Sequence, residues 1–362
     1  MNSKERVMCA INLEEPDRVP MTLHGTTWVQ QRLCRDLDCH SHKELMLKLR
    51  SDIVDIRGVV DPTYVGPGEA NEEISPGVFR NYLGWELREY ETEFGIEADY
   101  DGFILQDAAS IEEAAERFEW PKVDWFDFSG FAERLDAWQE FAVMVSSCSV
   151  FQHCTYLRHM EQFMLDLAMD QAMAEYLMDG YTDFYLAYFD KMFTEVKGRI
   201  DILRCADDLA SQRSLMISPE MFRSLVAPRL KKLIDLAHSH GVKFFFHSCG
   251  ALTPLIDDLI GLGIDILDPL QAAAEGMEPE ILKARFGDRV CLHGSICTQY
   301  LLPNGTPEEV AVETKRRIDL LAPDGGFILA PCHVLQNDVS TANVMALSDT
   351  GYHYGQQVMA GH

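Results

Sequence analysis

The stretch Val242–Gly250 reads VKFFFHSCG and changes character in its middle. Its first five residues have the composition of a buried strand, and His247 and Cys249 follow with a glycine directly behind them. Because side chains at positions i and i+2 lie on the same side of a strand, the imidazole and the thiol can share one partner. The stretch therefore predicts a buried strand that carries two potential metal ligands at its end.

Seven further apolar runs resemble this one, and most are followed by a helical pattern. They begin at Val19 (VPMTL), Asp52 (DIVDIRG), Phe141 (FAVMVSS), Ile200 (IDILRCADD), Ile264 (IDILDPLQ), Arg289 (RVCLHGSI) and Gly326 (GFILAPCH). Eight strand–helix units most simply close into a (β/α)8 TIM barrel, which needs roughly 250 residues. An open doubly wound α/β sheet is the alternative. No G-x-G-x-x-G motif follows the first run, so the barrel is favoured.

The chain has 362 residues, and those beyond the needs of a barrel fall in two places. We expect an N-terminal helix over Ser3–Leu13 and a long acidic insertion over 59–139, between the second and third strands. Within the insertion, GVFRNYLGWELREYE (77–91) is typical of a hairpin, which we expect to cover the barrel mouth as a lid. Helices are predicted to begin after Ser218 and Thr306, which are good capping residues. The chain is thus interpreted as one domain over 1–362.

The charge of the chain excludes several classes of partner. With 58 acidic and 31 basic residues, the formal net charge is -27, which would repel nucleic acid and an anionic membrane surface. The N-terminus lacks the apolar core of a signal peptide, and no segment approaches the length of a membrane span. Ten cysteines without a secretory signal predict free thiols or metal ligands in a reducing cytoplasm.

Reactive residues of such a barrel belong at the C-terminal ends of its strands. There, His247, Cys249 and Cys332 supply one nitrogen and two thiolates, a set that suits Zn²⁺. Three protein ligands would leave a fourth position for water, substrate or a weakly held side chain. The alternative is two buried cysteines and a hydrogen-bonded histidine. Zinc is favoured because Cys332 ends a second strand at the matching level.

Two further residues are candidates for catalysis. Asp207 continues the alternation from Cys205, so we expect it to face inward as an acid/base group or as the partner of a metal-bound histidine. A helix cap before Leu209 is an equally weighted alternative. His293 ends the seventh predicted strand. The residues expected to bind substrate lie at or just after strand ends: His24, Trp28, Asp208, Gln271, His333 and Gln336.

Several segments carry a family pattern. NLEEPDRVPM, ADDLASQRSLMISPEMFRSLVAPRLKKLID, FFFHSCG, HGSI and GGFILAPCHVLQNDVSTANVMAL resemble the uroporphyrinogen decarboxylase (URO-D) superfamily. The resemblance covers most of the chain, is strongest after Ile200 and implies a barrel. The true decarboxylases of this superfamily share an arginine-rich segment after the first strand, which binds the carboxylates of the tetrapyrrole. Here that strand runs into His24, Gly25 and Thr26, and this departure argues against decarboxylation.

The other branch of the superfamily comprises zinc-dependent methyltransferases that work with corrinoid proteins, and their His-x-Cys and distant Cys ligands look like His247, Cys249 and Cys332. The resemblance implies that zinc either activates a thiol acceptor or acts as a Lewis acid on a methyl donor. The chain has no D-x-H-x-x-G-type corrinoid-binding motif, so the corrinoid (cobalamin) would be carried by a separate protein. Only Arg57 and Arg204 are placed to bind an anionic thiol. This favours a neutral methyl donor, such as a methoxylated or methylated small molecule.

Three hypotheses follow from the sequence. The leading one is a zinc-dependent methyltransferase that moves a methyl group between a small molecule and a separate corrinoid protein. The second is a metal-independent decarboxylase of the uroporphyrinogen type. The third is a non-catalytic relative that binds a tetrapyrrole or a corrinoid.

Overall fold

A computed structural model describes residues 1–93 and 95–360, and its central element is a seven-stranded parallel sheet. In spatial order its strands are β1 (Ile53–Asp55), β8 (Ala142–Cys148), β9 (Ile202–Ala206), β10 (Lys243–His247), β11 (Ile266–Leu270), β12 (Cys291–Ile296) and β13 (Phe327–Pro331). Each strand corresponds to one of the apolar runs. The predicted α/β class with parallel strands is therefore confirmed.

The first apolar run, residues 19–23, joins both edges of this sheet without forming a full strand. Met21 makes a parallel bridge with Leu329 of β13, and the Asp52 N–H beside β1 donates to the Met21 carbonyl at 2.7 Å. A buried ion pair between Arg18 and Asp52, also 2.7 Å, holds the run in place. The first of the eight predicted strands is thus present as an isolated bridge to β13, with one hydrogen bond from the residue before β1.

Helix α1 (Ser3–Ile11) covers the end of the sheet where the strands begin. It starts with a capping box between Asn2 and Glu5 and ends close to the expected boundary. One apolar cluster contains its buried face and the first inward-facing residue of most strands: Val7, Ala10, Ile11, Ile53, Ala142, Met144, Ile202, Phe245, Ile266, Cys291 and Ile328. The helix therefore shields this end of the sheet from water, and chemistry is left to the opposite end.

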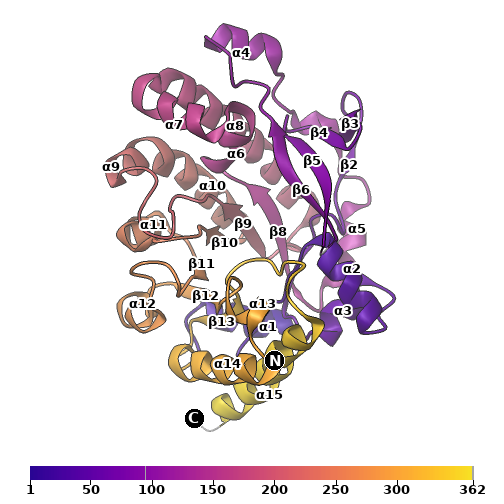
Figure 1. Cartoon of the computed structure of the whole chain (residues 1–362), viewed down its shortest axis with the longest axis vertical. Coiled ribbons are helices and arrows are strands. Elements are labelled where there is room, and N and C mark those ends of the chain that lie inside the picture. Colours follow the sequence, from indigo (N-terminus) through magenta and orange to yellow (C-terminus); the bar gives the residue numbers. More distant parts are fainter. Residues whose placement is uncertain (94, 361–362) are drawn as a thin grey trace.

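The other helices lie around the sheet (Figure 1). They are α2 (Thr27–Asp36), α3 (His42–Lys48), α6 (Gln152–Arg158), α7 (Met160–Met169), α8 (Gln171–Val196), α10 (Ala227–Ser239), α11 (Ile256–Leu262), α12 (Pro279–Phe286), α13 (Leu301–Asn304), α14 (Pro307–Leu321) and α15 (Thr341–Ala360), with a 3-10 turn at η4 (Thr253–Leu255). Helix α14 has the predicted Thr306 cap. Within the described residues, none of the helices is both long and apolar enough to span a membrane.

The helix predicted to follow Ser218 is interrupted. It begins as α9 (Pro219–Met221), passes through one π-helical segment at η3 (Phe222–Val226) and continues as α10. Pro228 has no N–H to donate to the preceding turn, which accounts for an irregular ladder at this point. The Ser218 cap is present, and Gly241 follows the helix with a positive φ of 74°.

The segment between β1 and β8 forms small antiparallel sheets. One contains β3 (Asn71–Ser75), β4 (Val78–Asn81), β5 (Glu86–Thr92) and β6 (Gly95–Gly102), and the other pairs β2 (Thr63–Tyr64) with β7 (Phe126–Asp127). The rest comprises α4 (Ile111–Arg117), η1 (Val123–Trp125), α5 (Phe131–Leu135) and η2 (Asp136–Trp138). The hairpin predicted within 77–91 is confirmed, since β4 and β5 pair directly. The sheet β3–β6 lies on the side of the molecule away from α9, α11 and α12 (Figure 1).

Candidate functional site

Strand alternation converts an apolar layer into a polar one inside the sheet. On each strand, one inward-facing residue packs on α1, and the residue two positions later points to the same inward face. These later residues are Asp55, Ser146, Arg204, His247, Asp268, His293 and Ala330. Most can hydrogen bond or carry charge, and they stand directly above the apolar floor. The C-terminal ends of the strands therefore hold the candidate site, as expected for a barrel-like fold.

Asp268 on β11 is the centre of this layer. Its carboxylate accepts hydrogen bonds from Nδ1 of His247 on β10 and from Nδ1 of His293 on β12, the second at 2.6 Å. Burial alone would raise the pKa of Asp268, but the two imidazoles outweigh it and hold that pKa below its usual range. With Nδ1 of His247 engaged, its Nε2 faces the opposite direction and is available to a ligand.

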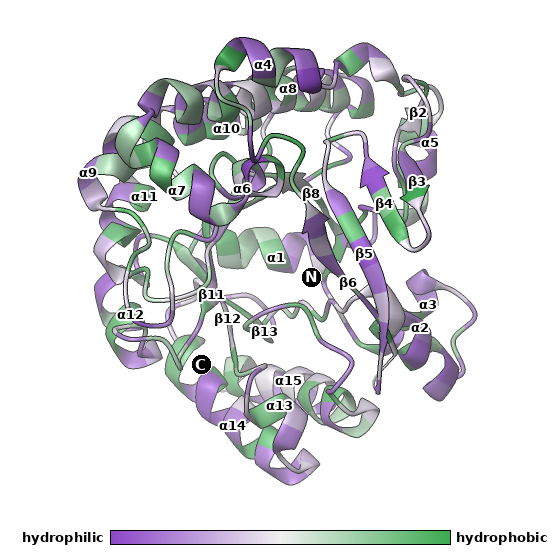
Figure 2. Cartoon of the chain, turned by 45° about the horizontal axis from the view of Figure 1, so that its top comes forward, coloured by the Kyte–Doolittle hydropathy of each residue, from purple (hydrophilic) through white to green (hydrophobic). Residues whose placement is uncertain are grey.

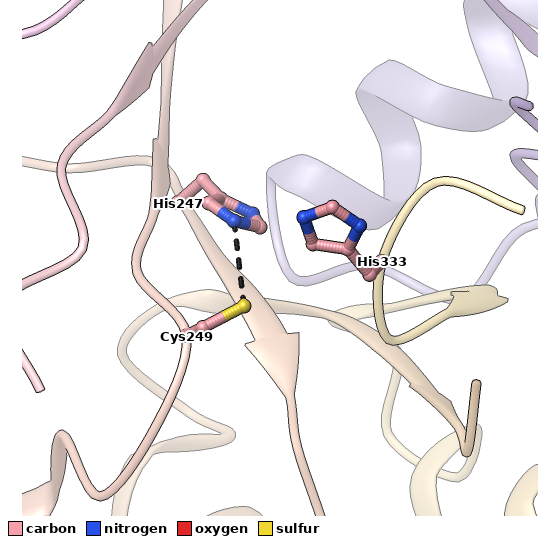
Figure 3. Close-up of side chains that lie close together, drawn as sticks. All are labelled: His247, Cys249 and His333. Carbon is pink, nitrogen blue, oxygen red and sulfur yellow. Dashed lines mark hydrogen bonds between the residues drawn. The ribbon is translucent and has the colours of Figure 1, made fainter. Parts of the chain in front are cut away.

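A group able to hold a metal lies next to this nitrogen. Among the described residues, His247, Cys249 and His333 each offer one ligand atom, and these atoms all lie within 4.8 Å of one another. The Cys249 thiol is 3.6 Å from His247 Nε2, and the ring of His333 faces both from the loop after β13 (Figure 3). Asp208 holds the loop, because its carboxylate accepts the Cys249 N–H at 2.8 Å. Two of the three predicted zinc ligands are thus side by side.

The third predicted ligand, Cys332, points elsewhere in this structure. Its buried thiol donates to the Leu270 carbonyl at 3.2 Å, and burial raises its pKa to about 12. His333, which the sequence placed among the substrate contacts, completes the group in its stead. Cys332 is the immediate neighbour of His333, so it remains next to the site. Its role as a zinc ligand stays a prediction.

A small cavity of about 60 Å³ opens beside the metal-capable group. Its polar lining consists of Thr22, His24, Asp55, Arg57, Arg204, His247, Asp268, His293 and His333, and its apolar lining of Ile53, Met144, Phe245, Ala330, Pro331 and Val334. Two buried atoms of this lining, Thr22 Oγ1 and His293 Nε2, have no hydrogen-bond partner within the described residues. Because buried polar atoms are normally satisfied, these two are free to bind a polar group of a substrate.

Two charged or titratable residues of the lining stand out. The Arg204 guanidinium lies over the Phe245 ring, 5.7 Å from its centroid, and forms no ion pair in the part of the chain that the structure describes. Burial lowers the pKa of His24 to about 4, with Arg57 and Arg204 adding to the effect and Asp55 opposing it. The His24 imidazole is therefore neutral at physiological pH and can accept or donate a hydrogen bond.

Asp207 was expected to face the cavity, but it points away from it. Its carboxylate accepts the Ser149 hydroxyl and the N–H groups of residues 150–152 at the start of α6. Burial raises its pKa, and these hydrogen bonds oppose that shift. The physical reason is the phase of β9: Arg204 faces inward, so Cys205 and Asp207 face the helices. Asp207 is thus placed to fix the loop between β8 and α6.

The remaining predicted residues have more peripheral places. Gln271 accepts the Gly250 N–H at 2.7 Å and so holds the loop that carries Cys249. Trp28 lies half-buried on α2 and does not line the cavity, and Gln336 donates to the Val334 carbonyl at 3.3 Å on the exposed loop after β13.

Sequence reasoning missed three members of the site: Thr22, Asp55 and Asp268. Alternation within VPMTL and DIVDIRG was the signal for the first two. Asp268 lies in the run IDILDPLQ, but its two histidine partners lie 21 and 25 positions away, and no local pattern could connect them.

Comparison with known proteins agrees with this arrangement. The model of the uroporphyrinogen decarboxylase (URO-D) family matches residues 132–354, well over half of the chain. The fold is an α/β fold related to the TIM barrel, and the chain belongs to the URO-D family.

Two curated relatives are methyltransferases. The chain is 31% identical over 170 residues to the methylcobamide:CoM methyltransferase MtaA of Methanosarcina barkeri, and 28% identical over 176 residues to MtbA of Methanosarcina acetivorans. The matched part is 45% of this chain and 45% of MtaA, so the chain matches about half the length of these relatives. A solved methyltransferase from Methanosarcina mazei superposes with a TM-score of 0.64 over 98% of this chain and 99% of that one, at 18% identity, which shows a shared fold.

Proposed function

We propose that the protein is a zinc-dependent methyltransferase that moves a methyl group between a small molecule and a corrinoid carried by a separate protein. The observation that carries the proposal is the pairing of His247 and Cys249 at the edge of the cavity, with Asp268 behind the imidazole. The methylcobamide:CoM methyltransferases that resemble the chain support it.

The donor set fits zinc. Imidazole and thiolate are the ligands that Zn²⁺ prefers, and a carboxylate behind the ligand histidine is the usual way to fix its tautomer. His247 and Cys249 would hold the metal together with Cys332, once the Cys332 thiol turns from the Leu270 carbonyl. Bound zinc would act as a Lewis acid on a substrate heteroatom, or stabilise it as a thiolate. Asp268 orients His247 and keeps its Nε2 toward the site.

The cavity would bind the small molecule. Ile53, Met144 and Phe245 offer an apolar wall, and Thr22 Oγ1 with His293 Nε2 would hydrogen bond a polar group. These contacts would hold the reacting heteroatom toward His247 and exclude water from it. The sequence favoured a neutral methyl donor.

The unpaired Arg204 gives the cavity a cationic wall, which supports an anionic substrate as the competing case. A neutral methoxylated donor and an anionic thiol acceptor are therefore the two substrate types to compare.

The predicted insertion 59–139 would act as a lid over this cavity within a single domain. Tyr100 of β6 stacks on Tyr156 of α6 with ring centroids 3.8 Å apart, which ties the small sheet to the rim of the large one. Thr92, Glu93 and Glu97 share a surface hollow with the loop 336–338 after β13. Strand β5, which pairs with β4 and β6 inside this small sheet, carries exposed charged residues and is drawn as largely hydrophilic in Figure 2. The stacking at one end and the shared hollow at the other support a cover that spans the mouth.

The test is methyl transfer with free methylcobalamin in place of the corrinoid protein. Purified protein with zinc is mixed anaerobically with methylcobalamin and either a neutral or an anionic thiol, and the loss of methylcobalamin absorbance is followed. The reverse direction uses cob(I)alamin and a methoxylated aromatic compound. We expect transfer in at least one direction, abolished by a chelator and by Cys249→Ala but retained in Cys34→Ala, whose thiol lies on α2 away from the site.

Two results would contradict the proposal. Turnover of uroporphyrinogen that persists in chelator would establish the decarboxylase alternative instead. Tight binding of methylcobalamin without transfer to or from any of these compounds would favour the non-catalytic relative.

A further inference from the structure

The metal-capable group contains one residue that the sequence analysis did not predict as a metal ligand. His247, Cys249 and Cys332 are the predicted set, and His333 lies with the first two although it belonged to no metal prediction. We infer that His333 occupies the fourth coordination position of the metal while the cavity is empty, and that the substrate displaces it. The inference rests on the proposed zinc chemistry and identifies the weakly held side chain that an open catalytic site allows.

The backbone brings both residues of the Cys332–His333 pair to the site. β13 ends at Pro331, and the Cys332 N–H still donates to the Ile296 carbonyl of β12 at 2.8 Å. Cys332 is therefore anchored against the sheet, whereas His333 is the first residue free of it. The rings of His333 and His247 lie 5.7 Å apart, centroid to centroid, at 63°, so the two imidazoles approach one point from different directions (Figure 3).

His247 and His333 differ in how firmly they are held. His247 is 3% exposed, and its Nδ1 is bound to the Asp268 carboxylate. His333 is solvent-exposed within the cavity, and its ring forms no hydrogen bond to any residue that the structure describes. A ligand histidine with a carboxylate partner is fixed in orientation, while one without such a partner can turn away at little cost. His333 is thus the exchangeable histidine of the group.

The position of His333 also decides which ligand the substrate meets. His333 and His247 line the cavity, whereas Cys249 is not part of its lining. A substrate heteroatom that enters the cavity therefore reaches the His333 side of the group. His24 and His293 line the same cavity, but neither belongs to the group within 4.8 Å, and His293 already uses Nδ1 on Asp268. His333 is the histidine whose place a substrate can take.

The exchange is balanced as a ligand substitution. The bond from the metal to the His333 nitrogen would break as a bond from the metal to the lone pair of the substrate heteroatom forms. The freed imidazole would keep its lone pair and turn toward the cavity. No electron would be transferred. A neutral donor such as an ether or thioether brings no proton into the exchange, whereas a thiol such as 2-mercaptoethanol would bind as the thiolate and give its proton to the freed imidazole or to solvent.

Zinc X-ray absorption of the intact protein tests the inference. Sulfur scatterers at about 2.3 Å and nitrogen or oxygen scatterers at about 2.0 Å can be counted, and imidazole rings give an additional multiple-scattering signal. We expect two sulfurs and two imidazoles in the wild type, and one imidazole fewer in His333→Ala. Addition of 2-mercaptoethanol should remove one imidazole signal and add one sulfur in the wild type. His333→Gln serves as a second variant should His333→Ala fold poorly, and His238→Ala, on the outer face of α10, is the control that leaves the spectrum unchanged.

The outcomes separate the two claims. A wild-type spectrum with one imidazole, identical to that of His333→Ala, overturns the inference but leaves the zinc methyltransferase proposal standing. A second imidazole that persists after the thiol binds overturns the displacement step. Absence of bound zinc in both proteins overturns the proposed function itself.

Discussion

The variant Asp268→Asn tests most sharply how the site supports a metal ligand. One buried carboxylate serves His247 and His293 together, and asparagine offers a single acceptor oxygen beside an N–H donor. The amide can therefore satisfy only one of the two imidazoles in its present tautomer, and it removes the negative charge behind the ligand. Loss of such a partner weakens metal binding by about 10- to 100-fold, which is about 1.4–2.8 kcal/mol.

The measurement is a competition for zinc against a chromophoric chelator at fixed pH, with thermal unfolding recorded for each protein. Asp201→Asn is the matched control, because Asp201 is also buried and accepts the Val143 N–H at 2.9 Å, but it precedes β9 at the opposite end of the sheet. The control should bind zinc within about twofold of the wild type. Wild-type affinity in a folded Asp268→Asn protein would refute the role of Asp268 behind the metal ligand.

Three further outcomes are expected. Zinc binding at pH 7 should release about two protons, because burial raises the pKa of the thiols of Cys249 and Cys332. The affinity for zinc should therefore fall by about 100-fold per pH unit on acidification. Calorimetry in buffers of different ionisation enthalpy counts the released protons, and a value of one removes Cys332 from the ligand set. Asp207→Ala should lower the free energy of unfolding in urea by about 3 kcal/mol, because four donors lose their acceptor, and a loss below about 1 kcal/mol contradicts its anchoring role. Arg204→Met should raise KM for an anionic thiol by about tenfold and leave that for a neutral thiol unchanged; equal changes would exclude Arg204 from charge recognition.

Much of the fold follows from local patterns in the sequence. Seven apolar runs became strands because parallel strands buried on both faces read as short continuous hydrophobic segments. The exception, VPMTL, is bridged to β13 and hydrogen bonded to the residue before β1, and it ends before a full ladder forms. The π-helical segment before Pro228 also lay beyond the pattern, because the periodicity of the apolar residues continues through it.

The site was less accessible to sequence reasoning. Continuous apolar strands do not reveal which face points inward, and for this reason Asp207 was expected in the cavity while Arg204 occupies it. The clustering of His247 and Cys249 could be predicted, because it needs only the two-residue period of one strand. The carboxylate shared by two histidines and the approach of His333 depend on neighbouring strands and on a loop, which no single segment encodes.

The central claim is that this cavity is built around zinc, and the most direct test is the metal content of the protein purified without added metal. We expect about one equivalent of zinc in the wild type and well under half an equivalent in Cys249→Ala, measured by inductively coupled plasma mass spectrometry. Less than about half an equivalent in the wild type, unchanged in Cys249→Ala and not restored by added zinc, would contradict the account.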